Sequence, residues 1–425
     1  MLRWPGWLVA RPSPDGEPKI ASWHVLKQRR YLVYFAGNLV SSLGTWLQNT
    51  AQLLLAYQLT HSAFAVGVIT CAQFSGFLVI GPWAGTLADR FGSRNVLIGT
   101  QIASAGVAGT LAYLQFTGKL NERSLVIGAL AMGVAFTFAL PAQTTMAPRL
   151  VNETDTKAAM AMNSVAYNAG RTLAPVLCVA VLASIGTAWA FTLNAISFAV
   201  FAVAIIAVRP RQARRPERRA HDWLGLRIAV WEPRILLLLT MVAAVTVADD
   251  PVLVLGPSLA HQVLAVSHIW PAYFLSALGL GTVLGALVPT RPSTARRAAV
   301  PLLVLAISVI VFTSGLNAWL SLAAALVAGI AGLLTGAATQ TLLLGKAGSQ
   351  AANVMALWAV AWAGSKPLAS LADGWLATNF GVQWAGLLMA SPAIVVACLE
   401  ILLSVRVKQK LKNFAYAHNH ALSRH

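Results

Sequence analysis

Among the charged side chains that interrupt long apolar stretches of the chain, we single out four as best suited to chemistry: Arg171, Asp249, Asp250 and Lys366. If these stretches cross a membrane, each buried charge costs roughly 3 kcal/mol even on a lenient insertion scale, so its presence indicates a function. Either aspartate could pair with Lys366, which would leave Arg171 to hold an anionic group. Because adjacent carboxylates repel each other, the two aspartates also suit the binding of a proton. The alternative is that both acids lie in water at an outer mouth of the protein and have no role in proton coupling.

A line of uncharged polar side chains runs along the stretch 31–60. Their steps of three or four residues place them on one face of a helix, and such a face inside a membrane should meet a cavity or another helix rather than lipid. We favour a wet cavity, with hydrogen bonding between helices as the alternative. The residues are Asn38, Ser41, Ser42, Thr45, Gln48, Asn49 and Gln52, and the candidates for the substrate cavity are Asn38, Thr45, Gln48, Asn49 and Gln52. Trp362, one helical turn before Lys366, could stack on an aromatic ligand or cover the ammonium group, with simple packing as the alternative.

The elements that position these residues follow from composition. Of the 425 residues, 57% are hydrophobic and 10% are charged, whereas a soluble domain has about 25% charged residues. The apolar blocks have the length of a helix that crosses a bilayer, and they lack the alternation of barrel strands. We therefore predict an all-α integral membrane protein with twelve transmembrane helices. The predicted spans are 31–60, 65–87, 96–116, 125–148, 158–184, 189–208, 235–256, 269–289, 299–315, 319–344, 353–377 and 383–404.

The basic residues predict the orientation of these spans. If the N-terminus is cytoplasmic, nearly all Lys and Arg outside the spans lie on the cytoplasmic side, and only Lys119 and Arg123 fall in outer loops. By the positive-inside rule, both termini are then cytoplasmic and the protein lies in the cytoplasmic (inner) membrane. Topology thereby explains the net charge of +18, and we expect no nucleic-acid partner.

The spans divide into two similar halves. An Arg- and Pro-rich stretch separates six spans from six, and Gly81 and Gly85 in the first half correspond to Gly281 and Gly285 in the second. Such a parallel duplication is typical of transporters whose substrate binds between the halves near the bilayer midplane. We predict a basic cytoplasmic leader (1–30), an N-terminal six-helix bundle (31–208), an Arg-rich cytoplasmic linker (209–234), a C-terminal six-helix bundle (235–404) and a cytoplasmic tail (405–425).

The loop after the second span has a distinctive sequence. It reads Gly85-Thr-Leu-Ala-Asp89-Arg90-Phe-Gly92-Ser-Arg94 and resembles the G-x-x-x-D-R-x-G-R-[KR] signature of the major facilitator superfamily. The resemblance implies the fold of that superfamily, two pseudo-symmetric six-helix bundles. It also implies that these residues form a cytoplasmic gate that latches the two halves: Gly85, Asp89, Arg90, Gly92 and Arg94.

Other segments resemble one branch of that superfamily, the drug and siderophore exporters. This branch includes the enterobactin exporter and macrolide efflux pumps and is called the transmembrane secretion effector family. The similar segments are Tyr34–Trp46, Leu140–Ala142, Asn163–Pro175 and Phe191–Asn194. The resemblance implies that the first, fourth, seventh and tenth helices line a central cavity and that transport runs outward.

These observations predict a secondary transporter rather than an enzyme. We expect export of a small amphiphilic or anionic molecule, a drug-like compound or siderophore, by alternating access and proton antiport. Import of a small metabolite, by proton symport or facilitated uptake, is the alternative. The sequence holds no Walker-type Gly-Lys-Ser/Thr stretch for ATP, and its histidines lie in predicted loops and tails, which disfavours a membrane metalloenzyme. A channel or receptor would lack the gate and the coupling acids. We expect no cofactor, no metal and a monomer whose partners are the substrate, the lipid bilayer and the proton gradient.

Overall fold

The computed structural model describes residues 22–81, 90–210, 232–267, 269–288, 294–347 and 351–422. All secondary structure in these ranges is helical. Nine helices of the described part are long and apolar enough to cross a membrane, and the shorter apolar helix α2 accompanies them. Each predicted span overlaps a helix or, for 353–377, two consecutive helices; the helix in 65–87 ends at Val79, and residues 82–87 of that span lie outside the described residues. The predicted gate residues Gly85 and Asp89, and nearly all of the predicted linker, lie outside the described residues.

The chain forms two compact units, which we describe separately. Unit 1 comprises Met1–Thr60 and Ala72–Arg219, and unit 2 comprises His61–Cys71 and Ala220–His425. The first part of α2 therefore groups with unit 2, although its sequence position lies within the predicted N-terminal bundle.

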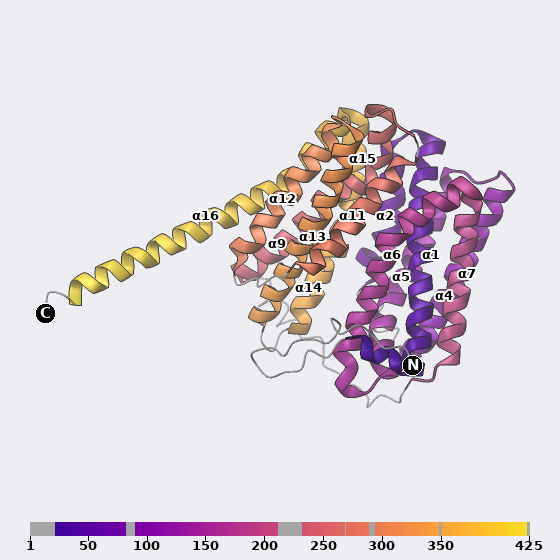
Figure 1. Cartoon of the computed structure of the whole chain (residues 1–425), viewed down its shortest axis with the longest axis horizontal. Helices are drawn as coiled ribbons and strands as arrows, with labels where there is room; N and C mark the ends of the chain where they lie inside the picture. Colours follow the sequence, from indigo (N-terminus) through magenta and orange to yellow (C-terminus); the bar gives the residue numbers. More distant parts are fainter. Residues whose placement is uncertain are drawn as a thin grey trace, which may run out of the picture. The chain divides into compact units, whose positions relative to one another are not determined.

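The helices of unit 1 follow the first six predicted spans (Figure 1). A short 3₁₀ helix, η2 (Ser22–Lys27), precedes them, and two more, η3 (Ala147–Leu150) and η4 (Glu153–Asp155), connect α5 with α6. The helices are α1 (Arg29–Thr60), α2 (Ala63–Val79, of which unit 1 contains the part from Ala72), α4 (Ser93–Phe116), α5 (Glu122–Met146), α6 (Thr156–Ser184) and α7 (Thr187–Ala207).

Local sequence signals fix two ends of these elements. α5 begins with a capping box, in which the side chain of Asn121 accepts a hydrogen bond from the backbone of Ser124 and the Ser124 hydroxyl accepts one from the backbone of Asn121. The segment before α1 is tied to the start of α6, because His24 and Gln28 contact the carboxylate of Asp155 at 2.8 and 2.7 Å.

Close helix contacts hold unit 1 together. α1 packs against α6 and α7, and α4 packs against α5 and α7. Gly170 of α6 lies so near α1 that a Cβ at this position would sit 2.7 Å from the backbone of Ser42. Small residues allow such an approach, which provides van der Waals contact between helices in lipid.

Unit 2 contains the remaining helices (Figure 1). A short α10 (Gly256–Ser258) and a π-helical turn, η5 (Leu259–Val263), follow α9. The longer elements are α9 (Pro233–Val254), α11 (Trp270–Leu287), α12 (Ala295–Ser314), α13 (Ala318–Ala347), α14 (Ala351–Ala363), α15 (Ser365–Phe380) and α16 (Val382–Leu422). The predicted tail 405–425 is thus helical as far as Leu422, as the last part of α16.

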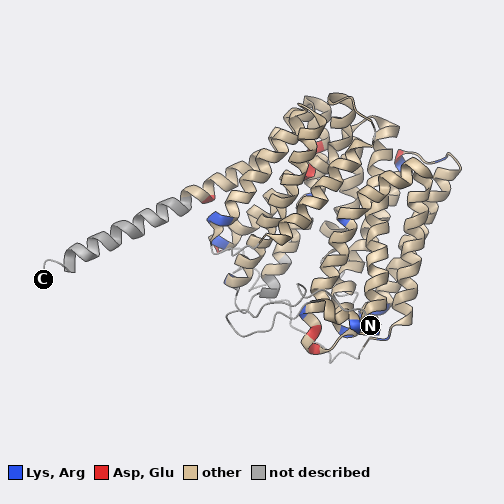
Figure 2. Cartoon of the chain, viewed as in Figure 1, with Lys and Arg blue, Asp and Glu red and all other residues tan. Residues whose placement is uncertain are grey.

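Unit 2 also uses glycine at its helix crossings. Gly281 of α11 faces the backbone of Leu326 in α13, and Gly329 of α13 faces the backbone of Leu278 in α11, with no room for a Cβ at either position. Charged residues are few along the helices of both units (Figure 2). The charged residues that do lie within helices are therefore the natural place to look for a site.

Candidate functional site

α9 and α15 bring an ionic cluster together inside unit 2. The Lys366 ammonium lies 2.5 Å from Oδ1 of Asp250 and 3.6 Å from Oδ1 of Asp249. Asp250 is fully buried, and the side chains of Lys366 and Asp249 are 13% and 19% exposed. Both pairings considered from the sequence are present, and the burial of Asp250 disfavours the alternative in which the acids lie in open water.

A pair of tryptophans precedes this cluster on the same helical path. The rings of Trp358 and Trp362 stack with their centroids 6.1 Å apart and an interplanar angle of 10°. α14 ends at Ala363, and Gly364 keeps a near-helical conformation before α15 begins. The aromatic pair therefore lies directly before Lys366 along the chain, and the predicted Trp362 is in contact with a second indole.

Arg171 belongs to an aromatic cluster in unit 1. Its guanidinium carbon lies 5.9 Å from the centroid of the Trp46 ring, a distance suited to a cation–π interaction. Trp46 in turn meets Tyr167 edge-on at 5.7 Å. Arg171 and Tyr167 are one helical turn apart on α6, and this spacing is the signal that could have linked them from the sequence.

Three of the five predicted cavity residues of α1 lie at contacts with other helices. The Asn38 amide donates to Oδ1 of Asn163 in α6 at 2.6 Å. Gln48 accepts a hydrogen bond from Asn194 of α7 at 2.8 Å, and Gln52 donates to the carbonyl of Leu125 in α5 at 2.9 Å. The structure places Asn38, Gln48 and Gln52 where they join α1 to its neighbours, and all three are buried.

The other two predicted cavity residues of α1, Thr45 and Asn49, are less buried. The Thr45 hydroxyl donates to the carbonyl of Ser41 in its own helix at 2.8 Å. Asn49 accepts a hydrogen bond from the side chain of Gln73 at 2.8 Å. The helical stripe is thus divided: part of it joins helices, and Thr45 and Asn49 retain partly accessible side chains.

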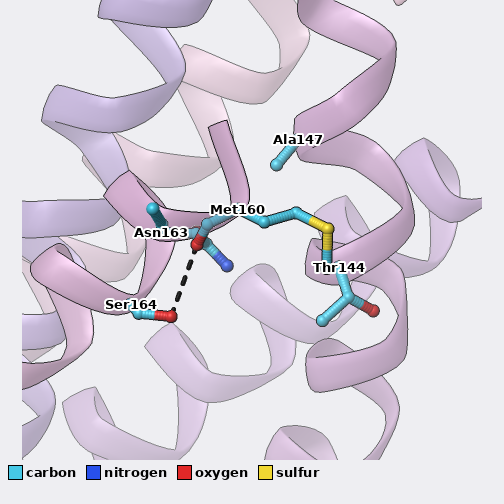
Figure 3. Close-up of a pocket in the computed structure, with 6 residues that line it drawn as sticks. Thr144, Ala147, Met160, Asn163 and Ser164 are labelled. Carbon is cyan, nitrogen blue, oxygen red and sulfur yellow. Dashed lines mark hydrogen bonds between the residues drawn. The ribbon is translucent and has the colours of Figure 1, made fainter. Parts of the chain in front are cut away.

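A pocket of about 230 Å³ opens between α5 and α6 of unit 1 (Figure 3). Thr144 and Ala147 line it from α5 and η3, and Met160, Asn163 and Ser164 line it from α6. The Ser164 hydroxyl donates to the carbonyl of Met160 at 3.3 Å. None of the residues predicted for the site lines this pocket, but its Asn163 is the partner of Asn38.

The described part of the predicted gate is attached to α7. The Arg94 guanidinium donates to the carbonyls of Ile205 and Ile206 at 3.2 and 2.7 Å, near the end of α7 where carbonyls lack helical partners. Gly92 has φ = 83°, a conformation that favours glycine, directly before α4. Arg90 is exposed with its guanidinium 5.5 Å from the Phe91 ring.

The sequence reasoning missed one charged residue of unit 2. Asp373 lies in α15 within the predicted span 353–377, and its side chain is fully buried. It follows Lys366 by seven residues, a spacing that places both on one face of a helix. This spacing was the available signal.

Comparison with known proteins connects these features to a family. The chain matches the family model described as transmembrane secretion effector over residues 20–423. The protein belongs to the transmembrane secretion effector family of major facilitator transporters. It is 27% identical over 187 residues to the uncharacterized MFS-type transporter YfiS of Bacillus subtilis, covering 44% of this chain and 43% of that protein. It is 21% identical over 198 residues to the staphyloferrin A transporter of Staphylococcus aureus, covering 46% of this chain and 50% of that protein. The chain thus spans about half the length of the curated relatives it matches.

Solved structures agree on the fold. A bacterial homologue of the human lysosomal transporter Spinster, in an inward-facing and unoccupied conformation, has a TM-score of 0.72 at 15% identity, covering 88% of this chain and 97% of that one. The human organic anion transporter MFSD10 has a TM-score of 0.63 at 16% identity, covering 88% and 99%. The predicted all-α major facilitator fold is confirmed, and the family and these structural neighbours are transporters rather than enzymes.

Proposed function

We propose that this transmembrane secretion effector exports a small amphiphilic or anionic molecule across the cytoplasmic membrane by alternating access, driven by proton antiport. The observation that carries the proposal is the ionic cluster of unit 2, in which Asp249 and Asp250 share the ammonium of Lys366. Two carboxylates facing one ammonium leave an excess negative charge. A proton bound by an acid in or beside this cluster offsets that excess, and its release restores it, which is the change in charge that proton coupling requires.

The Arg171 cluster of unit 1 supports an anionic substrate with an aromatic part. Arg171 provides a fixed positive charge on the face of Trp46, and guanidinium groups bind carboxylates and similar anions with paired hydrogen bonds. The partly accessible Thr45 and Asn49 are candidates for polar contacts with the same molecule. The name of the staphyloferrin A transporter is consistent with a siderophore as one member of this class.

The remaining parts of the proposal concern the orientation in the membrane, the oligomeric state and the cytoplasmic gate. Both termini face the cytoplasm and the protein works as a monomer, with Asp89, Arg90 and Arg94 forming the cytoplasmic gate. The bias of basic residues toward one side of the predicted spans supports this orientation. The contact of Arg94 with the end of α7 supports an anchoring role for the loop before α4.

Transport in sealed inside-out membrane vesicles tests the proposal. Staphyloferrin A and a fluorescent organic anion serve as probes, and an acidic lumen supplies the gradient. We expect the vesicles to accumulate at least one probe, and we expect a protonophore to abolish this accumulation. Unchanged accumulation after the gradient is collapsed would disprove proton antiport.

Matched variants and the opposite vesicle orientation complete the test. Lys366→Met should abolish gradient-driven accumulation, whereas Glu122→Gln, which removes an exposed carboxylate at the start of α5, should leave it unchanged. If right-side-out vesicles with an acidic exterior accumulate the probe instead, the protein is a proton-coupled importer and the proposed direction is wrong.

A further inference from the structure

Asp373 is a buried acid that the proposed site does not use. Its side chain has no solvent exposure, and neither carboxyl oxygen has a hydrogen-bond partner among the described residues. Asp250 is equally buried but has the Lys366 ammonium at 2.5 Å. The two buried carboxyls of unit 2 therefore differ: Asp250 has a cation beside it, and Asp373 does not have one in an equivalent position.

The helix positions bring Asp373 into the same electrostatic environment as the ionic cluster. Lys366, Ser370 and Asp373 follow one another on one face of α15, and α15 packs against α9, which carries Asp250. Asp373 interacts electrostatically with both Asp250 and Lys366. The group therefore contains three carboxyls and one ammonium.

Among the side chains that the structure describes, the elements around α15 supply no second cation near Asp373. In the described part of the chain, α15 packs against α9, α14 and α16, and it also meets the first part of α2. Taking α16 as far as Leu402, the charged or ionisable side chains that these elements carry, besides Lys366, are Arg234, Asp249, Asp250, Cys71, Cys398 and Glu400. Arg234 stands about 24 Å along α9 from Asp250 at 1.5 Å per residue, and it interacts with Glu400.

Tight backbone contacts cover α15 beside Asp373. A Cβ on Gly374 would lie 2.8 Å from Cα of Phe64 in α2. Gly67 of α2 in turn faces the carbonyl of Ser370, again with no room for a Cβ. This reciprocal glycine crossing lies within unit 2 and excludes water from that side of α15.

These observations point to a protonated acid. An ionised carboxylate without a partner is far more costly to bury than a neutral one, and the group neutralises by taking up a proton. One ammonium balances one carboxylate, and Asp250 lies nearer to the Lys366 ammonium than Asp249 does. Asp249 keeps some access to solvent. Asp373 is left as the carboxyl that a proton must neutralise.

We propose that Asp373 carries the exchangeable proton of the transport cycle, while the Asp250–Lys366 ion pair remains charged and positions it. In the release step the O–H bond of Asp373 breaks, the proton passes to water and a carboxylate remains. This inference rests on the proposed function, because it names the acid through which that antiport would be coupled.

Infrared difference spectroscopy of the purified full-length protein in detergent tests the assignment without a substrate. The carbonyl band of a protonated carboxylic acid is recorded as the pH is raised. We expect the wild type to show a band that disappears at high pH, Asp373→Asn to lack it and Asp249→Asn to keep it. In the double variant Asp249→Asn/Asp250→Asn, Lys366 loses both of its carboxylate partners and can pair with Asp373, so we expect the band to be absent at neutral pH.

Three outcomes would overturn the assignment. The first is a band that persists in Asp373→Asn but vanishes in Asp249→Asn. The second is a band unchanged in Asp249→Asn/Asp250→Asn, which stays informative even if Asp373→Asn does not fold. The third is a wild-type protein without the band whose thermal stability rises with sodium chloride but not with choline chloride, because Asp373 would then hold a metal cation.

The vesicle assay separates this inference from the proposed function. If the infrared band behaves as expected but accumulation of the probe does not depend on the pH gradient, proton antiport is wrong and the protonation of Asp373 stands. If accumulation depends on the gradient but the band does not belong to Asp373, antiport stands and the assignment is wrong.

Discussion

Removing the ammonium of unit 2 is the perturbation with the clearest expected magnitude. Lys366→Met keeps a long unbranched side chain but leaves the fully buried Asp250 without its cation. Breaking a buried ion pair by removing one partner costs about 3–5 kcal/mol. An attraction of this size is consistent with the 3.6 Å separation of Lys366 and Asp249, since unit charges about 4 Å apart attract by about 4 kcal/mol at an effective dielectric constant of about 20.

Protonation limits this cost and gives it a pH signature. Without its cation, Asp250 can take up a proton. From a reference pKa of about 3.9, protonating this carboxylate costs about 4 kcal/mol at pH 7. The cost falls by about 1.4 kcal/mol for each unit by which the pH is lowered. We therefore expect Lys366→Met to lose about 4 kcal/mol of unfolding free energy at pH 7 and about 1.5 kcal/mol at pH 5.

Reversible unfolding by SDS in mixed micelles, at both pH values, measures this loss. The double variant Asp250→Asn/Lys366→Met should recover most of the stability, because no unpaired buried charge remains. A loss below about 1 kcal/mol at pH 7, typical of an exposed pair, would refute the reasoning. A loss that grows at pH 5 would refute it as well.

Three further predictions concern unit 1. Arg171→Lys keeps the charge but removes the planar fork, so we expect at least tenfold weaker transport of an anionic probe in vesicles with unchanged expression, and full transport would remove Arg171 from the substrate site. Gly170→Val forces side-chain atoms into the backbone of Ser42, and it should cost about 1–3 kcal/mol in SDS unfolding, whereas an unchanged midpoint would contradict the close contact. Arg94→Gln removes the donors to Ile206 and should cost about 1–3 kcal/mol, measured in the same way; an unaltered stability would show that water replaces the contact.

Hydropathy was sufficient to predict the helices but not their partners. Every predicted span has a helical counterpart because spans depend on runs of apolar residues, which are local in the sequence. The polar stripe of α1 was also visible as a helical period. The period could not show that Asn38, Gln48 and Gln52 bond to three different helices, because helix order around α1 is set by packing across the whole unit.

Asp373 illustrates the opposite failure. Asp373 and its spacing from Lys366 are visible in the sequence, but the interpretation of this span concentrated on the tryptophans before Lys366. Its significance depends on full burial and on the glycine crossing with α2, and neither can be inferred from one span alone. The link between Arg171 and Trp46 likewise required the close approach of α6 to α1.

The polar contacts of unit 1 have a consequence for the order of synthesis. Gln48 bonds to Asn194, which is 146 residues later in the chain, and Arg94 bonds to Ile206, 112 residues later. At roughly 5–20 residues per second, Gln48 waits roughly 7–30 s for its partner. During that time lipid cannot satisfy its amide. A nascent chain halted after α5 should therefore stay bound to the insertion machinery, and release from it should coincide with the emergence of α7.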